Sequence, residues 1–456
     1  MFYNTKKTVS TIALLLILLV TLLIVTVPCV IAAADSWTTM EPMPTAIGGL
    51  KAAVVNGKIY AIAGAVNYEY DPATDTWAIK KPMPTSRHEF GIAVYENKIY
   101  CIGGSYTGIN EVYYPETDTW ETKSPMPTNR SQLEANVVNG KIYLIGGRTG
   151  GQKTTVNLNE VYDIETDTWT TKEPIPYPVV QYASAVVDDK IYVMGGQNEY
   201  HALGTPINLD LNQIYDTETD TWSLGAHLPT VVWNAAAGAT TGINAPKRIY
   251  VIGGLPGGGG MATNITQVYD PENDKWKRGA SMPTARAWLA IAVVNDTLYA
   301  IGGSSWLFLP EKAVNEQYTP IKFGTIAPNV QVVSPENRTY DSSNVSLVFT
   351  VNHPVVWMAH NIDGQGTVTI TGNITLSGLS NGLHNITVYA KSEFNGYIGN
   401  SETIIFSIAE EPEPEVELES EIELEPFPTT PVVIASVVII TVVGAGLLIY
   451  FKKRKR

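Results

Sequence analysis

A run of the form Ile-Tyr-x-Ile-Gly-Gly, with small variations, occurs six times along the chain and sets its architecture. The copies end at Gly64, Gly104, Gly147, Gly196, Gly254 and Gly303. A Tyr-Asp-like segment follows each copy, and five units then reach a tryptophan in an Asp-Thr-Trp-like sequence, at Trp77, Trp120, Trp169, Trp222 and Trp276. A turn resembling Pro-Met-Pro-Thr leads into the next unit. A period of about 40–55 residues with four short strand-like segments predicts a six-bladed β-propeller.

The order of diglycine, tyrosine and tryptophan resembles the kelch family over residues 37–318. The resemblance implies an all-β protein in which residues 35–325 form a six-bladed kelch propeller. Two units depart slightly from the pattern, with Ala63-Gly64 in place of a diglycine and Pro174-Ile175-Pro176 in place of Pro-Met-Pro.

The sixth unit lacks the closing tryptophan, and a spare one stands before the first unit. Unit six ends at Tyr318, whereas Trp37 lies in Ser-Trp-Thr-Thr near the start of the repeats. We infer from this that the N-terminal strand completes the last blade and closes the ring, which would remove an exposed strand edge.

Residues 326–409 have a different pattern, with short alternating segments separated by Asn- and Gly-containing turns. This pattern predicts an antiparallel β-sandwich, and it resembles the Ig-like modules of prokaryotic surface proteins. The strands are expected near Val330–Ser334, Val345–Val351, Val356–His360, Thr367–Thr371, Ile386–Ala390 and Thr403–Ile408.

The two ends of the chain indicate export and membrane anchoring. Residues 1–34 are typical of a signal peptide, and an uncleaved anchor is the alternative. Residues 410–430 form an acidic Pro/Glu stalk, and residues 431–451 carry no charge, enough for a helix of about 30 Å that spans a bilayer. The basic tail at 452–456 predicts a cytoplasmic C-terminus. We therefore expect a single-pass cell-membrane protein with its propeller and Ig-like domain outside the cell.

The charge and cysteine content narrow the function further. A formal net charge of −14 argues against nucleic acid as a partner. Once a signal peptide is removed, Cys101 is the only cysteine and is predicted to be a small core residue. The sequence predicts no cofactor and no metal site.

A candidate ligand site follows from the loops that share one face of a propeller. Inner strands on that face begin with Arg87, Arg130 and Arg286, and Trp306 lies in a long loop there. Two residues beyond each arginine position stand Gly49, Glu89, Gln132, Gln181, Asn234 and Trp288. Arginine and amide groups recognise carboxylates and hydroxyls, and aromatic rings stack on sugars. This favours an anionic or polar ligand, such as an acidic glycan or a peptide carboxylate. The alternative is that the arginines hydrogen-bond blade carbonyls.

The function expected from these features is binding or adhesion at the cell surface, with an extracellular protein or glycan as the partner and no catalysis. Two alternatives stay open. The resemblance allows an enzyme similar to a sialic-acid mutarotase, with Glu89 or His88 as general base. The third class is a purely structural envelope protein.

Two further sets of residues recur. Candidate glycosylation sequons are Asn129, Asn264, Asn295, Asn337, Asn344, Asn373 and Asn385, and with the two termini they resemble archaeal surface proteins. The acids of the Asp-Thr-Trp-like sequences are Asp75, Asp118, Asp167, Asp220 and Asp274. We expect them to cap turns.

Overall fold

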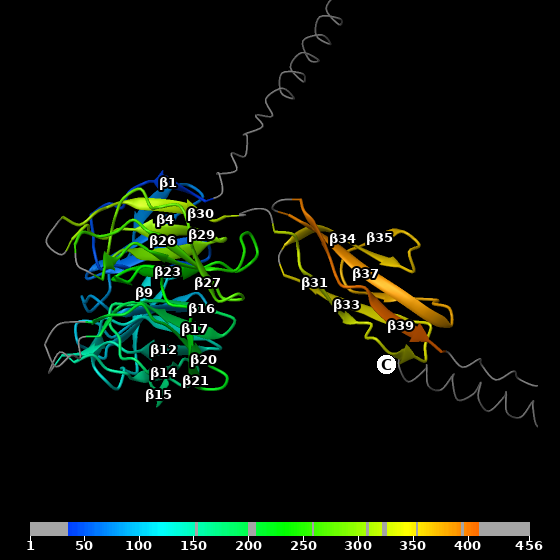
Figure 1. Cartoon of the computed structure of the whole chain (residues 1–456), viewed down its shortest axis with the longest axis horizontal. Coiled ribbons are helices and arrows are strands. Elements are labelled where there is room, and N and C mark those ends of the chain that lie inside the picture. Colours follow the sequence, from blue (N-terminus) through cyan, green and yellow to red (C-terminus); the bar gives the residue numbers. More distant parts are fainter. Residues whose placement is uncertain are drawn as a thin grey trace, which may run out of the picture.

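The fold is all-β in the described part of the chain. The computed structural model describes residues 35–150, 154–198, 207–257, 260–306, 310–321, 326–352, 354–393 and 396–409. These residues form a set of repeated four-stranded sheets and a C-terminal β region (Figure 1).

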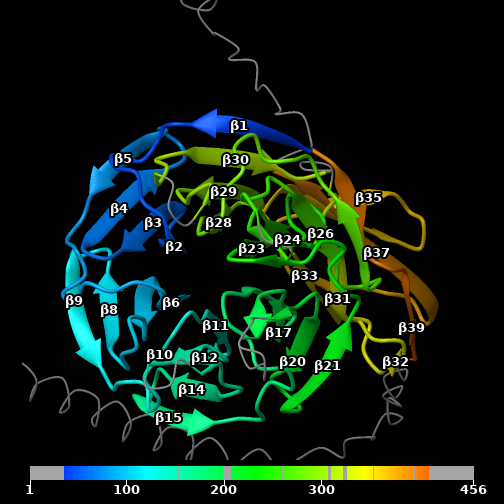
Figure 2. The same cartoon turned by 60° about the vertical axis from the view of Figure 1, so that its left-hand side comes forward.

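In the described part of the chain, six four-stranded antiparallel sheets, here called blades 1 to 6, are arranged in a ring (Figure 2). A central channel is lined by residues of all six blades. Blades 1 to 3 contain β2 (Lys51–Val55), β3 (Lys58–Ala63), β4 (Val66–Asp71), β5 (Thr76–Ile79), β6 (Gly91–Tyr95), β7 (Lys98–Ile102), β8 (Asn110–Tyr114), β9 (Thr119–Lys123), β11 (Ala135–Val138), β12 (Lys141–Ile145), β14 (Asn159–Asp163) and β15 (Thr168–Thr171). Blades 4 to 6 contain β16 (Ala183–Val187), β17 (Lys190–Met194), β20 (Asn212–Asp216), β21 (Thr221–Gly225), β23 (Ala236–Ala239), β24 (Ile249–Ile252), β26 (Thr266–Asp270), β27 (Lys275–Arg278), β28 (Ala290–Val294), β29 (Thr297–Ile301), β30 (Asn315–Thr319) and β1 (Ser36–Met40).

The innermost strands line the channel, and each contacts the innermost strand of the next blade, so that β28 of blade 6 returns to β2 of blade 1. The second strands are almost fully buried because blades pack against each other on both of their faces. This explains their near-continuous apolar sequences.

The diglycines are required where the chain leaves these second strands. Gly103 and Gly104 both have positive φ, at 70° and 86°. A Cβ on Gly104 would lie 2.5 Å from the carbonyl oxygen of His88. Only glycine therefore allows the chain to turn this close to the entry of the inner strand.

The predicted ring closure is confirmed. Strand β1 pairs antiparallel with β30, so the N-terminal strand becomes the outermost strand of blade 6. The Trp37 indole donates a hydrogen bond to the Ala280 carbonyl at 2.9 Å, and Tyr318 donates to Asp35 at 2.7 Å.

The acids of the Asp-Thr-Trp-like sequences do something other than the expected turn capping. Asp118, with φ of 52°, accepts hydrogen bonds from the Tyr113 hydroxyl at 2.7 Å and from the Lys81 backbone N–H at 2.8 Å. Trp120 donates to the Lys81 carbonyl, so the acid and the tryptophan together hold the segment that enters the blade. Turn capping falls instead to the preceding acid of the Tyr-Asp segment, such as Asp216.

Among the described residues, three two-stranded sheets lie outside the blades. They are β10 (Arg130–Ser131) with β13 (Arg148–Thr149), β18 (Gln197–Asn198) with β19 (Ile207–Asn208), and β22 (Val232–Trp233) with β25 (Leu255–Pro256).

The C-terminal β region consists of two sheets with a shared apolar core around Leu347, Ile386, Val388 and Phe406. One sheet has the order β31 (Val330–Ser334), β33 (Val345–Val351) and β36 (Ile374–Leu376). The other has the order β32 (Thr339–Tyr340), β39 (Ile404–Ile408), β37 (Gly382–Ser392), β34 (Val355–Ile362) and β35 (Thr367–Ile370), with β38 (Ile398–Asn400) paired to β37. The described pairings are antiparallel, as expected, except that β32 pairs parallel with β39.

The predicted signal peptide, stalk, membrane helix and basic tail lie outside the described residues. Within the described ranges, no helix is long and apolar enough to cross a bilayer.

Candidate functional site: the mouth of the central channel

Six residues in left-handed backbone conformation form a ring at one end of the channel. They are Gly49, Glu89, Gln132, Gln181, Asn234 and Trp288, one from each blade, with φ between 50° and 67°. Backbone N–H groups donate to the carbonyl of the preceding ring member, for example Asn234 to Gln181 at 2.8 Å and Gln132 to Glu89 at 2.9 Å. We call these six residues the mouth ring.

The local sequence explains why the chain turns at this point. Just before each ring residue, the chain hydrogen-bonds to the loop that follows a diglycine, as Trp233 does with Leu255 and Ala287 with Ser304. The chain must then reverse into the inner strand, and a left-handed residue makes this reversal. Asparagine and glycine tolerate that conformation well, whereas Trp288 is held there by its surroundings.

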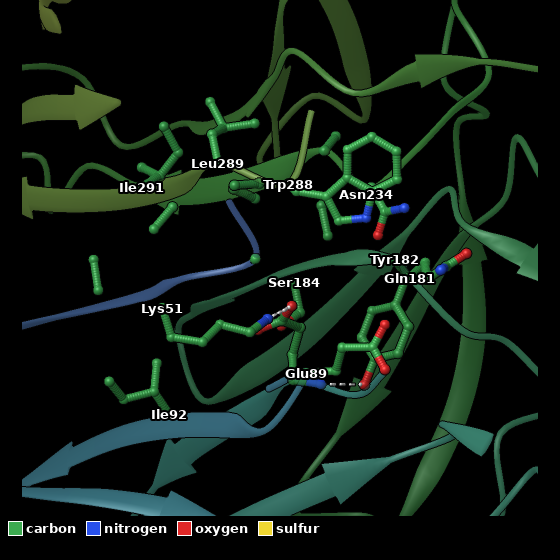
Figure 3. A pocket seen from close by; sticks show the side chains of 18 of the residues that line it. Lys51, Glu89, Ile92, Gln181, Tyr182, Ser184, Asn234, Trp288, Leu289 and Ile291 are labelled. Carbon is green, nitrogen blue, oxygen red and sulfur yellow. Dashed lines mark hydrogen bonds and ion pairs between the residues drawn. The ribbon is translucent and has the colours of Figure 1, made fainter. Parts of the chain in front are cut away.

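The channel behind the mouth ring contains a cavity of about 200 Å³ with mixed polar and apolar walls (Figure 3). Lys51 of blade 1 reaches into it and donates to the Glu134 carboxylate of blade 3. Ser184 donates to the Asn136 side-chain oxygen at 3.0 Å. These four residues were not predicted as site residues from the sequence.

A signal for part of this lining is present in the sequence. Gln132, Glu134 and Asn136 alternate along one inner strand, and Gly49 and Lys51 show the same two-residue spacing. Alternate residues of a strand point to the same side, so polar residues at this spacing mark the wall of the channel. Which blades face each other across the channel depends on the closed ring.

Several polar groups of the lining have no hydrogen-bond partner among the described residues. Gln132 Oε1, Asn136 Nδ2 and Asn234 Nδ2 are buried and unpaired, although Gln132 Nε2 donates to Glu89 at 3.1 Å. Unpaired buried polar atoms are costly, and three of them line this one cavity. The cavity is therefore a place where polar atoms of a ligand or solvent can be held.

The three predicted arginines lie elsewhere. Arg87, Arg130 and Arg286 are at most 1% exposed and sit inside their own blades. Arg130 donates to Glu160 at 2.7 Å and to the Leu144 carbonyl, and Arg286 donates to Glu316 at 2.7 Å. They hydrogen-bond blade carbonyls, as the alternative interpretation held, and they do not line the cavity.

The residues at the arginine position and at the buried glutamate position change together from blade to blade. In blades 4 and 5, valine stands in place of the arginine, and glutamine stands in place of the buried glutamate. Gln213 and Gln267 bind the backbone of Tyr177 and Thr230 instead, through both side-chain atoms. Each blade therefore contains either a complete charged pair at this position or none.

Three tryptophans gather beside the mouth ring. Trp233, Trp288 and Trp306 are partly buried around a small cluster that includes Leu255. The rings of Trp233 and Trp288 meet edge to face with centroids 6.0 Å apart. Trp288 also lines the cavity next to Asn234, so the aromatic cluster and the polar lining meet there (Figure 3).

The remaining predicted residues are placed as follows. Asn129, Asn295, Asn337, Asn344, Asn373 and Asn385 are exposed, and Asn264 is half-buried. Burial raises the pKa of the Cys101 thiol to about 12, which fits its predicted role as a core residue. Among the described residues, no three His, Cys, Asp or Glu side chains come close enough to hold a metal ion.

Comparisons with known proteins agree with the repeat pattern. A family model described as the KLHDC2/KLHL20/DRC7 Kelch-repeats domain matches residues 49–223 and 109–303. The chain is 35% identical over 89 residues to Kelch-like protein 35 of Mus musculus, 30% over 98 residues to Beta-scruin of Limulus polyphemus, and 33% over 118 residues to Halomucin of Haloquadratum walsbyi. These matches cover 20%, 20% and 24% of this chain.

The chain spans only a small part of these relatives, namely 14%, 10% and 1% of their respective lengths. Among solved structures, that of YjhT matches with a TM-score of 0.52 at 17% identity, over 61% of this chain and 96% of that one. At this identity the match concerns the fold alone. Because the two overlapping family matches together span residues 49–303, more than half of the 456-residue chain, the protein belongs to the kelch-repeat family.

Proposed function

We propose that this protein is a binding or adhesion module of the cell surface, which holds a polar ligand in the mouth of its central channel. One observation carries the proposal, namely the buried, unpaired groups of Gln132, Asn136 and Asn234 in a single cavity. A ligand that both donates and accepts hydrogen bonds would satisfy these groups. The partner class is an extracellular protein or glycan, and the role is recognition rather than catalysis.

The charge of the mouth argues for a neutral or cationic group and against an anion. Glu89 and Glu134 line the cavity, and Lys51 neutralises one of them. Arg87, Arg130 and Arg286 are already engaged inside the blades, so their guanidinium groups support the mouth from behind. The initial expectation of an acidic glycan or carboxylate depended on those arginines.

The proposed location follows from the ends of the sequence. A signal at residues 1–34 would export the chain, and a helix at 431–451 would anchor it with the basic tail in the cytoplasm. Residues 326–409 would then serve as an Ig-like spacer, and 410–430 as an extended stalk. The exposed sequons of the C-terminal β region fit an exported, glycosylated surface protein of archaeal type.

The proposal is tested by screening the purified full chain on arrays of glycans and envelope proteins beside a Gln132→Gly/Gln181→Gly variant. Glycine keeps the left-handed backbone, as Gly49 does in blade 1, while both side chains are removed. We expect binding to weaken by about tenfold or more, because two hydrogen-bonding groups are lost.

A matched control is Glu96→Gly/Asn97→Gly. These two polar residues also have positive φ, but they form the turn at the other end of an inner strand. Binding should survive this change. Equal binding by the wild type and the mouth variant would contradict the proposal. If the chain bound only to other copies of itself, a structural envelope role would be favoured.

A further inference from the structure

The mouth ring lacks a side chain at one position. Five of its members carry side chains, but Gly49 has none, and a Cβ placed there would meet no atom within 4 Å. Neighbouring positions are filled, so the ring is open at blade 1. We call this opening the Gly49 notch, bordered in the ring by Trp288 on one side and Glu89 on the other.

The notch has chemically different sides. On one side, Trp288 lines the cavity, and the ring of Trp233 contacts it edge to face. Glu89 offers carboxylate oxygens, one of which accepts from Gln132. A Cβ on Gly48 would lie 3.3 Å from Glu311 Oε1, so a second carboxylate lies against the residue before Gly49.

The hydrogen-bonding groups behind the notch narrow the ligand class. Asn136 and Asn234 present unpaired donors, and Gln132 presents an unpaired acceptor. An ammonium group only donates and a carboxylate only accepts, whereas a hydroxyl does both. With the arginines turned into the blades, Lys51 is the one cationic side chain among the described residues that line the cavity, and it is paired with Glu134.

We propose that the Gly49 notch admits the uncharged end of a glycan, with the apolar face of a sugar ring on Trp288 and its hydroxyls on Glu89, Gln132 and Asn234. This inference rests on the proposed function and names the ligand class of the same site. Aromatic rings offer sugars a flat apolar surface, and amide and carboxylate groups fix their hydroxyls.

The test is a Gly49→Gln variant of the full chain. Gln132 and Gln181 occupy the equivalent positions of blades 3 and 4 with the same backbone conformation, so the substitution completes the ring without a foreign geometry. The matched control is Gly57→Gln, which changes a glycine of positive φ and open surroundings at the turn between β2 and β3. Trp288→Gln is the second variant and removes the stacking surface.

The neutral probes are maltotriose, cellotriose, mannotriose and lactose, and the charged probes are sialyllactose and tetramethylammonium. Their binding is measured by tryptophan fluorescence and by calorimetry. We expect at least one neutral sugar to bind, and Gly49→Gln and Trp288→Gln each to weaken it by about tenfold or more. Gly57→Gln should bind as the wild type does.

Two results would overturn the inference. If only a charged probe binds and Gly49→Gln abolishes that binding, the site stands and the ligand class is wrong. If the neutral sugars bind equally well to all variants, or no probe binds, the notch is not the entry. The array experiment with Gln132→Gly/Gln181→Gly separates the two proposals. If that variant loses array binding, the channel-mouth function stands although the notch is not the entry.

Discussion

Single residues decide whether the interior of a blade is charged or neutral. Arg130 and Glu160 are both almost fully buried and face each other at 2.7 Å, while blade 5 has Val232 and Gln267 in their places. A buried charge without its partner is strongly destabilising, whereas replacing both partners is often neutral. Blade 5 therefore shows that this fold accepts a blade in which both partners are replaced by uncharged residues.

We predict that Arg130→Val alone lowers the free energy of unfolding by about 3–5 kcal/mol, because Glu160 is left buried without its cation. The double variant Arg130→Val/Glu160→Gln should recover most of this loss, since it reproduces the pair found in blade 5. Chemical denaturation of the full chain measures both. If the double variant were as unstable as the single one, the buried pair would not explain the pattern.

At the scale of elements, β34 and β37 of the C-terminal β region carry two histidines with opposite titration behaviour. Burial alone would lower the pKa of His384, but hydrogen bonds to the Ser380 carbonyl at 2.7 Å and to Asp363 at 2.6 Å raise it above its usual value. Burial lowers the pKa of His360. The cationic form of His384 and the neutral form of His360 are therefore the ones that the fold favours.

We predict that this region loses stability both when the pH rises and when it falls. The contribution of His384 is fully present below its unfolded pKa of about 6.5 and is lost as pH rises through the raised folded pKa. The contribution of His360 is present above about 6.5 and is lost as pH falls through its lowered folded pKa. Hydrogen exchange at the amides of Ile386 and Val388 reports on this region.

In that experiment His384→Gln is the discriminating variant. It should remove the loss of protection at high pH and leave the loss at low pH in place. A high-pH loss unchanged by the substitution would show that the bonds to Asp363 and Ser380 do not control the titration.

At the scale of the whole molecule, the ring depends on β1. Without residues 35–40, Tyr318 loses its hydrogen bond to Asp35, Ala280 loses two hydrogen bonds, and β30 becomes an exposed edge. We predict that deleting residues 35–40 lowers the melting temperature by more than about 5 °C, as loss of a few kcal/mol does in domains of this size. Differential scanning calorimetry measures the shift. An unchanged melting temperature would mean that closure adds no stability.

Much of this architecture was predictable because each blade repeats one local pattern. The six mouth-ring positions and the role of Trp37 follow from aligning the units with one another. The direction of the arginines was not predictable, because a residue that enters a strand can turn toward the channel or the blade with the same spacing. The Lys51–Glu134 pair was also missed, since residues 83 positions apart meet only across a closed ring.

Ring closure also has a consequence for the order of synthesis. Of the described propeller strands, β1 is synthesised first and its partner β30 last, and Asp35 meets Tyr318 across 283 positions. The other blades complete their sheets from strands that lie close together in the sequence and have no such delay. The first strand must therefore wait, unpaired, until almost the whole propeller has been translated, so an early stop in translation leaves a fragment that has its earliest strand but nothing to pair it with.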